Sequence, residues 1–240
     1  MVNAVASPSL PGCKTIWQKT LAMADFDPLV LEGKQARNAR PAYGLTLVVD
    51  YPLPDDVLHG IGRLRPVCRG VLGDGVVLYP DDHLHLTVYS LLRSRTEPLP
   101  EAELAALWPR WLSRLEAMAG QLPSLAVLLR GLAVTGDGAV LVCGAATDGL
   151  RWLQEQVSQL PGVAAPRDIP PHVTIGQVRR PCGAFGQAMA ALHRHAADPV
   201  GTLRATRLCM LYYRSRLLDQ VMQQAVIPLG PGGSKVACLR

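Results

Sequence analysis

The sequence lacks the long apolar run that a membrane-spanning helix needs. No stretch of about 18 consecutive apolar residues occurs in it. The N-terminus also lacks the basic region, apolar block and small-residue cleavage site of a secretory signal peptide. We therefore expect a protein that makes no contact with a membrane and works in the cytoplasm.

Closely spaced cysteines are also missing. The six cysteines lie far apart and form no Cys-x-x-Cys pair, which argues against a zinc knuckle and against a disulfide framework. Two His-x-His pairs remain as candidate metal ligands, His83 with His85 and His193 with His195. The second pair falls in a helical pattern, where residues i and i+2 point about 200° apart, and no carboxylate has a fitting spacing. We expect no metal and no other cofactor.

A strong excess of charge of one sign is absent too. The formal net charge is +5 at pH 7, and it comes mostly from arginines that are scattered along the chain. This modest excess suits an anionic partner, but it does not indicate nucleic acid by itself.

The pattern of strands and helices predicts an α+β fold with an internal repeat. Within residues 43–229 the order strand, helix, loop, histidine-containing strand, helix, strand occurs twice. We expect two pseudo-symmetric lobes, roughly 43–135 and 136–229, each an antiparallel-rich sheet with helices on its outer face. Residues 1–42 would form a loosely attached N-terminal extension, and the breaker-rich residues 230–240 a flexible tail outside the catalytic core.

The two histidine-containing strands carry the same four-residue signature, His-x-Thr-x with apolar x, at residues 85–88 and 172–175. In a strand, residues i and i+2 point to one face, so each histidine stands beside its threonine while the apolar residues face a core. An imidazole exchanges protons near neutral pH, and a hydroxyl can donate a hydrogen bond to a phosphate oxygen. Two copies on apolar strands are rare by chance in a chain with six histidines and ten threonines. The pair predicts a site for phosphate chemistry.

With these two motifs, the chain resembles the two-histidine (2H) phosphoesterase superfamily, which includes the 2′-5′ RNA ligase-like proteins and the RNA 2′,3′-cyclic phosphodiesterases. The resemblance covers about residues 43–229, and residues 80–84, 170–171 and 211–215 support it as flanking context. It implies that the two motifs face a central cleft between the lobes, that the catalytic residues are His85 and His172, and that the phosphate-binding residues are Thr87 and Thr174. One histidine would activate water while the other protonates the departing ribose oxygen, without a metal. The sequence does not say which histidine plays which part.

Four further residues are candidate substrate contacts: His83, Tyr89, Arg179 and Tyr213. His83 and Tyr89 share the face of the first motif, and the tyrosines are possible stacking platforms for a base. In the family an arginine often follows the second motif closely, but here Gly176, Gln177 and Val178 intervene before Arg179. By the alternation of the strand, Gln177 should point to the core side.

The expected function is that of a hydrolase for phosphoric diester bonds. Its substrate would be a ribose 2′,3′-cyclic phosphate or a 2′-5′ phosphodiester, on an RNA end or a small nucleotide, and the protein would act as a monomer. One alternative is a phosphodiesterase for a cyclic or linear oligonucleotide signal. Another is a noncatalytic RNA- or nucleotide-binding module that kept the cleft. A binder needs no pair of titratable groups at one phosphate, which favours the enzyme.

Overall fold

The computed structural model describes residues 10–165, 170–215, 220–230 and 237–238. Within these residues the helices are α1 (Pro11–Leu21), α2 (Pro28–Ala39), α3 (Asp55–Leu72), α4 (Glu101–Gln121), α5 (Asp148–Ser158) and α6 (Phe185–His193), with short 3-10 turns at Gly73–Gly75 and Asp81–His83. The strands are β1 (Tyr43–Val49), β2 (Val76–Leu78), β3 (Leu86–Arg95), β4 (Leu125–Val134), β5 (Ala139–Gly144), β6 (His172–Val178), β7 (Pro199–Ala205), β8 (Arg207–Tyr213), β9 (Val221–Pro228) and β10 (Ala237–Cys238). None of the described helices is long and apolar enough to span a membrane.

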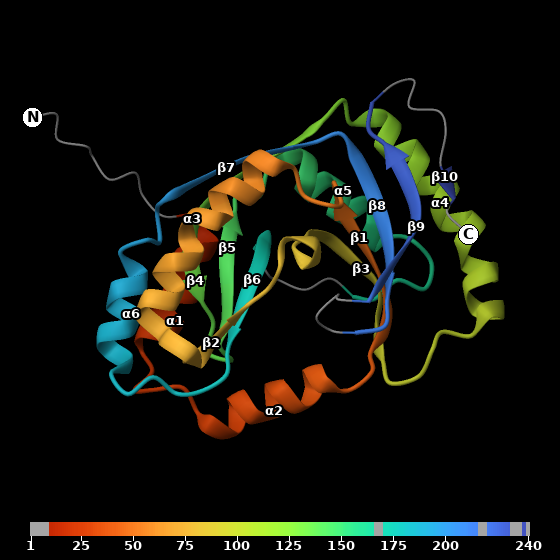
Figure 1. The fold of residues 1–240 in the computed structure, drawn as a ribbon. Coiled ribbons are helices and arrows are strands. Elements are labelled where there is room, and N and C mark those ends of the chain that lie inside the picture. The colour runs from red at the N-terminus through yellow and green to blue at the C-terminus, as the bar shows by residue number, and fades with distance from the viewer. Residues whose placement is uncertain (1–9, 166–169, 216–219, 231–236, 239–240) are drawn as a thin grey trace, which may run out of the picture.

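These strands form a single antiparallel sheet in the order β10-β9-β8-β1-β3-β6-β5-β4-β7, with β2 paired to β6 off this path. The sheet curls, so that its two halves face each other (Figure 1), with a cavity between them. We call them the β1 half, made of β10, β9, β8, β1 and β3, and the β6 half, made of β6, β5, β4, β7 and β2. The halves join where Leu86 of β3 pairs with Val173 of β6. The predicted α+β class with two lobes and a central cleft is confirmed.

The two halves of the sheet do not follow the two halves of the sequence. Strand β1 pairs with β3 on one side and with β8, from near the end of the chain, on the other. Strand β4, from the first sequence half, pairs with β5 and β7 of the second. The expected lobes at 43–135 and 136–229 therefore differ from the spatial ones, because late strands complete the half that β1 and β3 begin.

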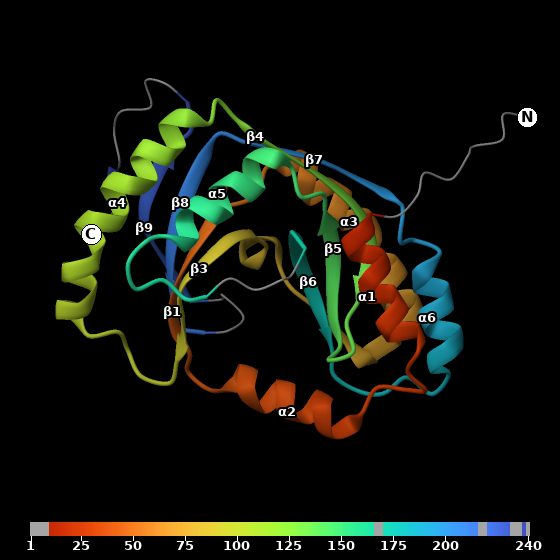
Figure 2. The same cartoon turned by 180° about the vertical axis from the view of Figure 1, so that it is seen from behind.

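Helices cover each half with apolar side chains. On the β6 half lie α1, α3 and α6, and on the β1 half lie α4 and α5 (Figure 1, Figure 2). Helix α4 continues through Pro109, and its Trp111 is fully buried and donates from Nε1 to the carbonyl of Pro161 at 2.8 Å. These helices shield apolar sheet surface from water, and two of them, α1 and α5, also border the cavity between the halves.

The N-terminal segment is packed more firmly than expected. Trp17 of α1 is 1% exposed and donates from Nε1 to the carbonyl of Leu132 at 2.7 Å. Thr20 is also buried, and its hydroxyl donates to the carbonyl of Val134 at 2.5 Å. Burial of an indole is worth several times the energy of one hydrogen bond. The expectation of a loosely attached extension is therefore wrong for α1, which is part of the β6 half.

At the other end of the chain, Ala237 and Cys238 form β10 and pair with β9. The rest of the expected C-terminal tail, apart from Gly230, lies outside the described residues.

Candidate active site

The two motif histidines are anchored in the same way. His85 ends the turn that leads into β3, and its Nδ1 lies 2.9 Å from the carbonyl oxygen of His83. His172 opens β6, and its Nδ1 lies 2.8 Å from the carbonyl oxygen of Pro170. A carbonyl only accepts, so Nδ1 must carry the hydrogen in both rings. Each neutral imidazole therefore keeps Nε2 as a free acceptor, fixed by a contact two residues back along the chain.

The pairing of Leu86 with Val173 sets the two motifs against each other. Both residues are fully buried on the core face, so their neighbours in each strand point to the opposite face. In an antiparallel pair, the residue before one partner lies opposite the residue after the other. This register places each motif histidine beside the threonine of the other motif: His85 next to Thr174, and His172 next to Thr87.

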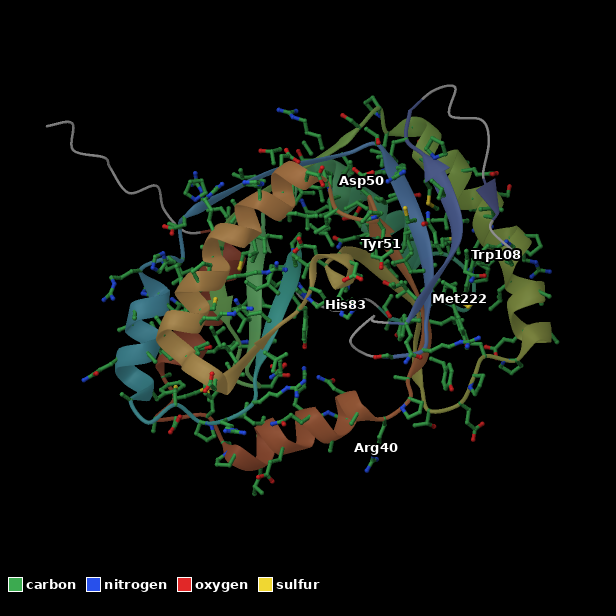
Figure 3. All side chains as sticks on the ribbon, in the orientation of Figure 1. Arg40, Asp50, Tyr51, His83, Trp108 and Met222 are labelled. Atoms are coloured by element: carbon green, nitrogen blue, oxygen red, sulfur yellow. The ribbon has the colours of Figure 1, made fainter. Side chains whose placement is uncertain are left out.

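A cavity of about 900 Å³ opens at this junction. Four of the predicted residues line it, namely His83, His85, His172 and Thr174. The volume lies within the usual range for sites that bind small ligands. Thr87 is partly exposed but is not among the described residues that line this cavity. Figure 3 shows the His83 side chain between the two halves of the sheet.

Burial changes the proton affinity of both motif histidines. Desolvation lowers the pKa of His85 from 6.5 to about 4; the carbonyl of His83 works against this shift, and repulsion from His172 adds to it. Desolvation also lowers the pKa of His172, opposed by the carbonyl of Pro170. Both rings are therefore neutral at pH 7 in the free protein. A bound anion would raise both pKa values again, because it stabilises an imidazolium.

The other three candidate contacts lie outside the cavity lining. The Tyr89 hydroxyl is directed into the protein and donates to the carbonyl of Ala164 at 2.8 Å. Arg179 is exposed, and its carbonyl accepts from Gln35 of α2. Tyr213 is 9% exposed and lies against Gly44, where an added Cβ would collide with its ring. Tyr89 shares strand β3 with the first motif, Arg179 follows the end of β6, and Tyr213 lies on β8. Their side chains serve packing or face solvent elsewhere.

The cavity has walls that the sequence pattern did not indicate. Helices α1 and α2 contribute Lys19 and Lys34, and α5 contributes Arg151 and Gln154. Gln154 is held by a 3.1 Å bond from Nε2 to the carbonyl of Val88, next to the first motif. These residues carry no motif, so only the three-dimensional arrangement identifies them.

The expectation that Gln177 points to the core side is wrong: Gln177 lines the cavity, because a register shift between Val140 and Leu141 interrupts the alternation of β6 against β5. Gln177 is 2% exposed, and its Nε2 donates to the carbonyl of Asp137 at 2.8 Å. In the described part of the chain, no group of three or more His, Cys, Asp or Glu side chains is placed to hold a metal ion.

Comparisons with known proteins agree with the fold. The described structure is similar to that of TT0787 of Thermus thermophilus, with a TM-score of 0.53 and 18% identity over 78% of this chain and 97% of that one. It is equally similar to E. coli LigT in its apo form, with a TM-score of 0.53 and 18% identity over 80% and 99% of the two chains. Atu0111 of Agrobacterium tumefaciens has a TM-score of 0.54 and 15% identity over 79% and 86%. A comparison with curated proteins finds no match.

The model of one family matches residues 53–216, which is more than half of the chain and includes both motifs. Since the fold also agrees, the chain belongs to the 2′-5′ RNA ligase superfamily of two-histidine phosphoesterases.

Proposed function

We propose that this protein hydrolyses a ribose 2′,3′-cyclic phosphate or a 2′-5′ phosphodiester, with His85 and His172 as its general acid and base. Membership of the superfamily supports a phosphoesterase-type enzyme. The observation that carries the finer proposal is the matched pair of histidines beside one cavity, each with Nδ1 fixed by a carbonyl and Nε2 left for proton transfer.

The reaction needs two proton transfers at one phosphorus atom. One imidazole is neutral and takes a proton from water on its Nε2 while the water oxygen bonds to phosphorus. The other imidazole is protonated and gives its Nε2 proton to the ribose oxygen as the bond from that oxygen to phosphorus breaks. The products are a phosphomonoester and a free ribose hydroxyl. The two rings exchange roles over the reaction, so the pair ends with one proton as it began.

The threonines would hold the non-bridging phosphate oxygens. A hydroxyl beside the opposite histidine can donate to an oxygen whose negative charge grows in the transition state. Thr174 lines the cavity and is the stronger candidate, while Thr87 stands beside His172 on the same face.

The choice of substrate has support from related folds. E. coli LigT, similar to this chain at a TM-score of 0.51, has been solved in complex with phosphate and in complex with 3′-AMP. A phosphate and a ribose 3′-phosphate are the groups that the proposed reaction uses and releases.

The proposal is tested by incubating the purified protein with 2′,3′-cyclic mononucleotides, an RNA with a cyclic-phosphate end, and 2′-5′ oligoadenylate. Phosphorus NMR and chromatography of the products identify the bond that is cleaved and the position of the remaining phosphate. We expect turnover of at least one substrate that persists in excess EDTA. Failure on all three would favour a nucleotide-binding module, and loss of activity in EDTA that zinc or manganese restores would overturn the metal-free mechanism.

A further inference from the structure

Helix α1 forms one rim of the cavity along its whole length. Its N-terminal end meets the second motif, because Gly12 lies directly against Pro170. Its C-terminal end is tied to the end of β4 by the bond from Thr20 to Val134. The helix has 11 residues and is therefore about 16 Å long. Figure 2 shows it lying along the β6 half, with α2 crossing the open side between the halves.

Strand β6, on the floor of the cavity, spans a distance similar to the length of α1. His172 stands at its start, and Gln177 lies five residues later, about 16 Å away at the rise of an extended strand. Gln177 donates to the carbonyl of Asp137 in the turn between β4 and β5. That turn therefore marks the far end of an elongated groove, and the motif histidines mark the near end.

Cationic side chains stand at both ends of this groove. At the near end, Arg151 donates from Nη1 to the carbonyl of Ala146 at 2.7 Å. At the far end, Lys34 of α2 lies 2.6 Å from a carboxylate oxygen of Asp137, and Lys19 projects from the last turn of α1. The lining described here contains three Lys and Arg side chains but a single carboxylate, that of Asp137.

That carboxylate offsets only one of the two lysine charges at the far end. Burial opposes its ionisation, but bonds from the Lys34 ammonium and the Thr135 hydroxyl outweigh burial and lower the pKa of Asp137. The ammonium of Lys34 has three donors, and the bond to Asp137 uses one of them, so two remain for a ligand. The carboxylate therefore positions Lys34, while Lys19 of α1 adds a second cation to the same lining.

The spacing indicates a ligand longer than one nucleotide. A single reacting phosphate with one negative charge needs only the groups at the near end for its binding. Stacked nucleotides advance by about 3.4 Å each, so a groove of about 16 Å has room for a few of them. A groove that follows a phosphate backbone with positive charge is the usual device for binding single strands.

We propose that the substrate is a short single-stranded oligonucleotide or RNA end, and that Lys19 and Lys34 bind a backbone phosphate upstream of the reacting one. The inference rests on the proposed function, because it places the reacting phosphate at the histidines. Both lysines precede residue 53, where the family match begins. The N-terminal segment, residues 10–39, is thus the part of this chain that selects oligonucleotides over mononucleotides.

The test compares two substrates with the same scissile bond, a nucleoside 2′,3′-cyclic phosphate and an RNA tetranucleotide that ends in one. In the full-length protein we expect a higher kcat/KM for the tetranucleotide. The ratio of the two values should fall about two- to fivefold for each lysine contact removed. The variants are Lys19→Gln and the double variant Lys34→Gln with Asp137→Asn, which avoids leaving the partly exposed Asp137 carboxylate without its lysine partner. Lys14→Gln is the matched control, since Lys14 is exposed on the same helix and does not line the cavity.

A binding measurement separates this proposal from the proposed reaction. The probe is a fluorescent tetranucleotide with a 3′-phosphate, followed by anisotropy at increasing salt. The slope of log affinity against log salt concentration should become shallower by about 0.7 for each lost contact. Equal kcat/KM for both substrates, unchanged in the lysine variants, would overturn the groove but leave the reaction intact. If the protein binds the probe in a lysine-dependent way but turns over neither substrate, the proposed reaction is overturned and the groove stands. If it neither binds the probe nor turns over a substrate, both proposals are overturned.

Discussion

The two motif sites are alike in their chemistry and unlike in their surroundings. Each presents a histidine whose Nδ1 is tied to a carbonyl two residues earlier. The site on β6, however, is walled by α1 and α2 and places Thr174 in the cavity, whereas Thr87 on β3 lies outside the lining. The repeat thus supplies two histidines that are anchored in the same way, while the segments around them make one side of the cavity different from the other.

The largest expected effect tests the equivalence of the histidines. His85→Ala and His172→Ala should each lower kcat by roughly a hundred- to ten-thousand-fold, because each removes a positioned proton carrier. Because the two act in one concerted transfer, the double variant should be little worse than the more damaging single one. Steady-state kinetics with far-UV circular dichroism as a control for folding would decide this. Multiplied losses in the double variant would instead indicate independent roles.

The threonines test the difference between the sites. Thr174→Val keeps the shape of the side chain but removes the hydroxyl, and we expect a loss in kcat of about ten- to a thousandfold. Thr87→Val should cost less, because Thr87 is outside the cavity lining. The two variants serve as controls for each other, in the same assay. Equal losses would show that the threonines act as symmetrically as the histidines.

The pH dependence of kcat/KM tests whether the two rings share one environment. Each histidine has a lowered pKa in the free protein, that of His85 lying at about 4. Catalysis needs one ring protonated and the other neutral, so kcat/KM should trace a bell with its maximum on the acid side of pH 6.5. The profile of kcat should lie at higher pH, because the bound phosphate raises both pKa values. A kcat/KM maximum above pH 7.5 would contradict the burial of the pair.

The smallest effect concerns stability. Between pH 6.5 and about 4, the unfolded chain binds a proton at His85 that the folded chain does not. The free energy of unfolding should therefore fall as pH falls through this window, by up to about 3 kcal/mol from this group. Urea unfolding of His85→Asn should show a flatter profile there. His59→Asn, on the surface of α3, is the control for replacing a histidine elsewhere in the chain.

The sequence was sufficient to predict the parts of the fold that depend on local pattern. Strand β6 at 172–178 contains the second motif, as the sequence pattern predicted, because a run rich in β-branched residues after breakers is a strong local signal. The two motif histidines lie beside one cavity, and their catalytic role stays a prediction. The lobe boundaries were not predicted correctly, since the partner of β1 is β8, and no local pattern encodes a pairing across most of the chain.

The residues that wall the cavity could not be predicted from the sequence pattern either. Cys13, Trp17 and Thr20 are the buried residues of α1, but they lie in a segment rich in polar residues and breakers, and the sequence therefore resembled that of an extension. Their contacts with β4 are what bring Lys19 to the cavity. A lysine on an exposed helix face has no local signature that distinguishes a ligand contact from a solvated charge.

The interleaved strand order has a consequence for synthesis of the chain on the ribosome. Leu47 of β1 pairs with Met210 of β8, so one edge of β1 stays unpaired until β8, more than 150 residues later, has emerged. An open apolar edge of this kind invites pairing with other chains, and contacts so distant in sequence form slowly. The nascent protein should therefore depend on chaperones more than its size suggests, and release of the C-terminal strands should be the event that ends this exposure.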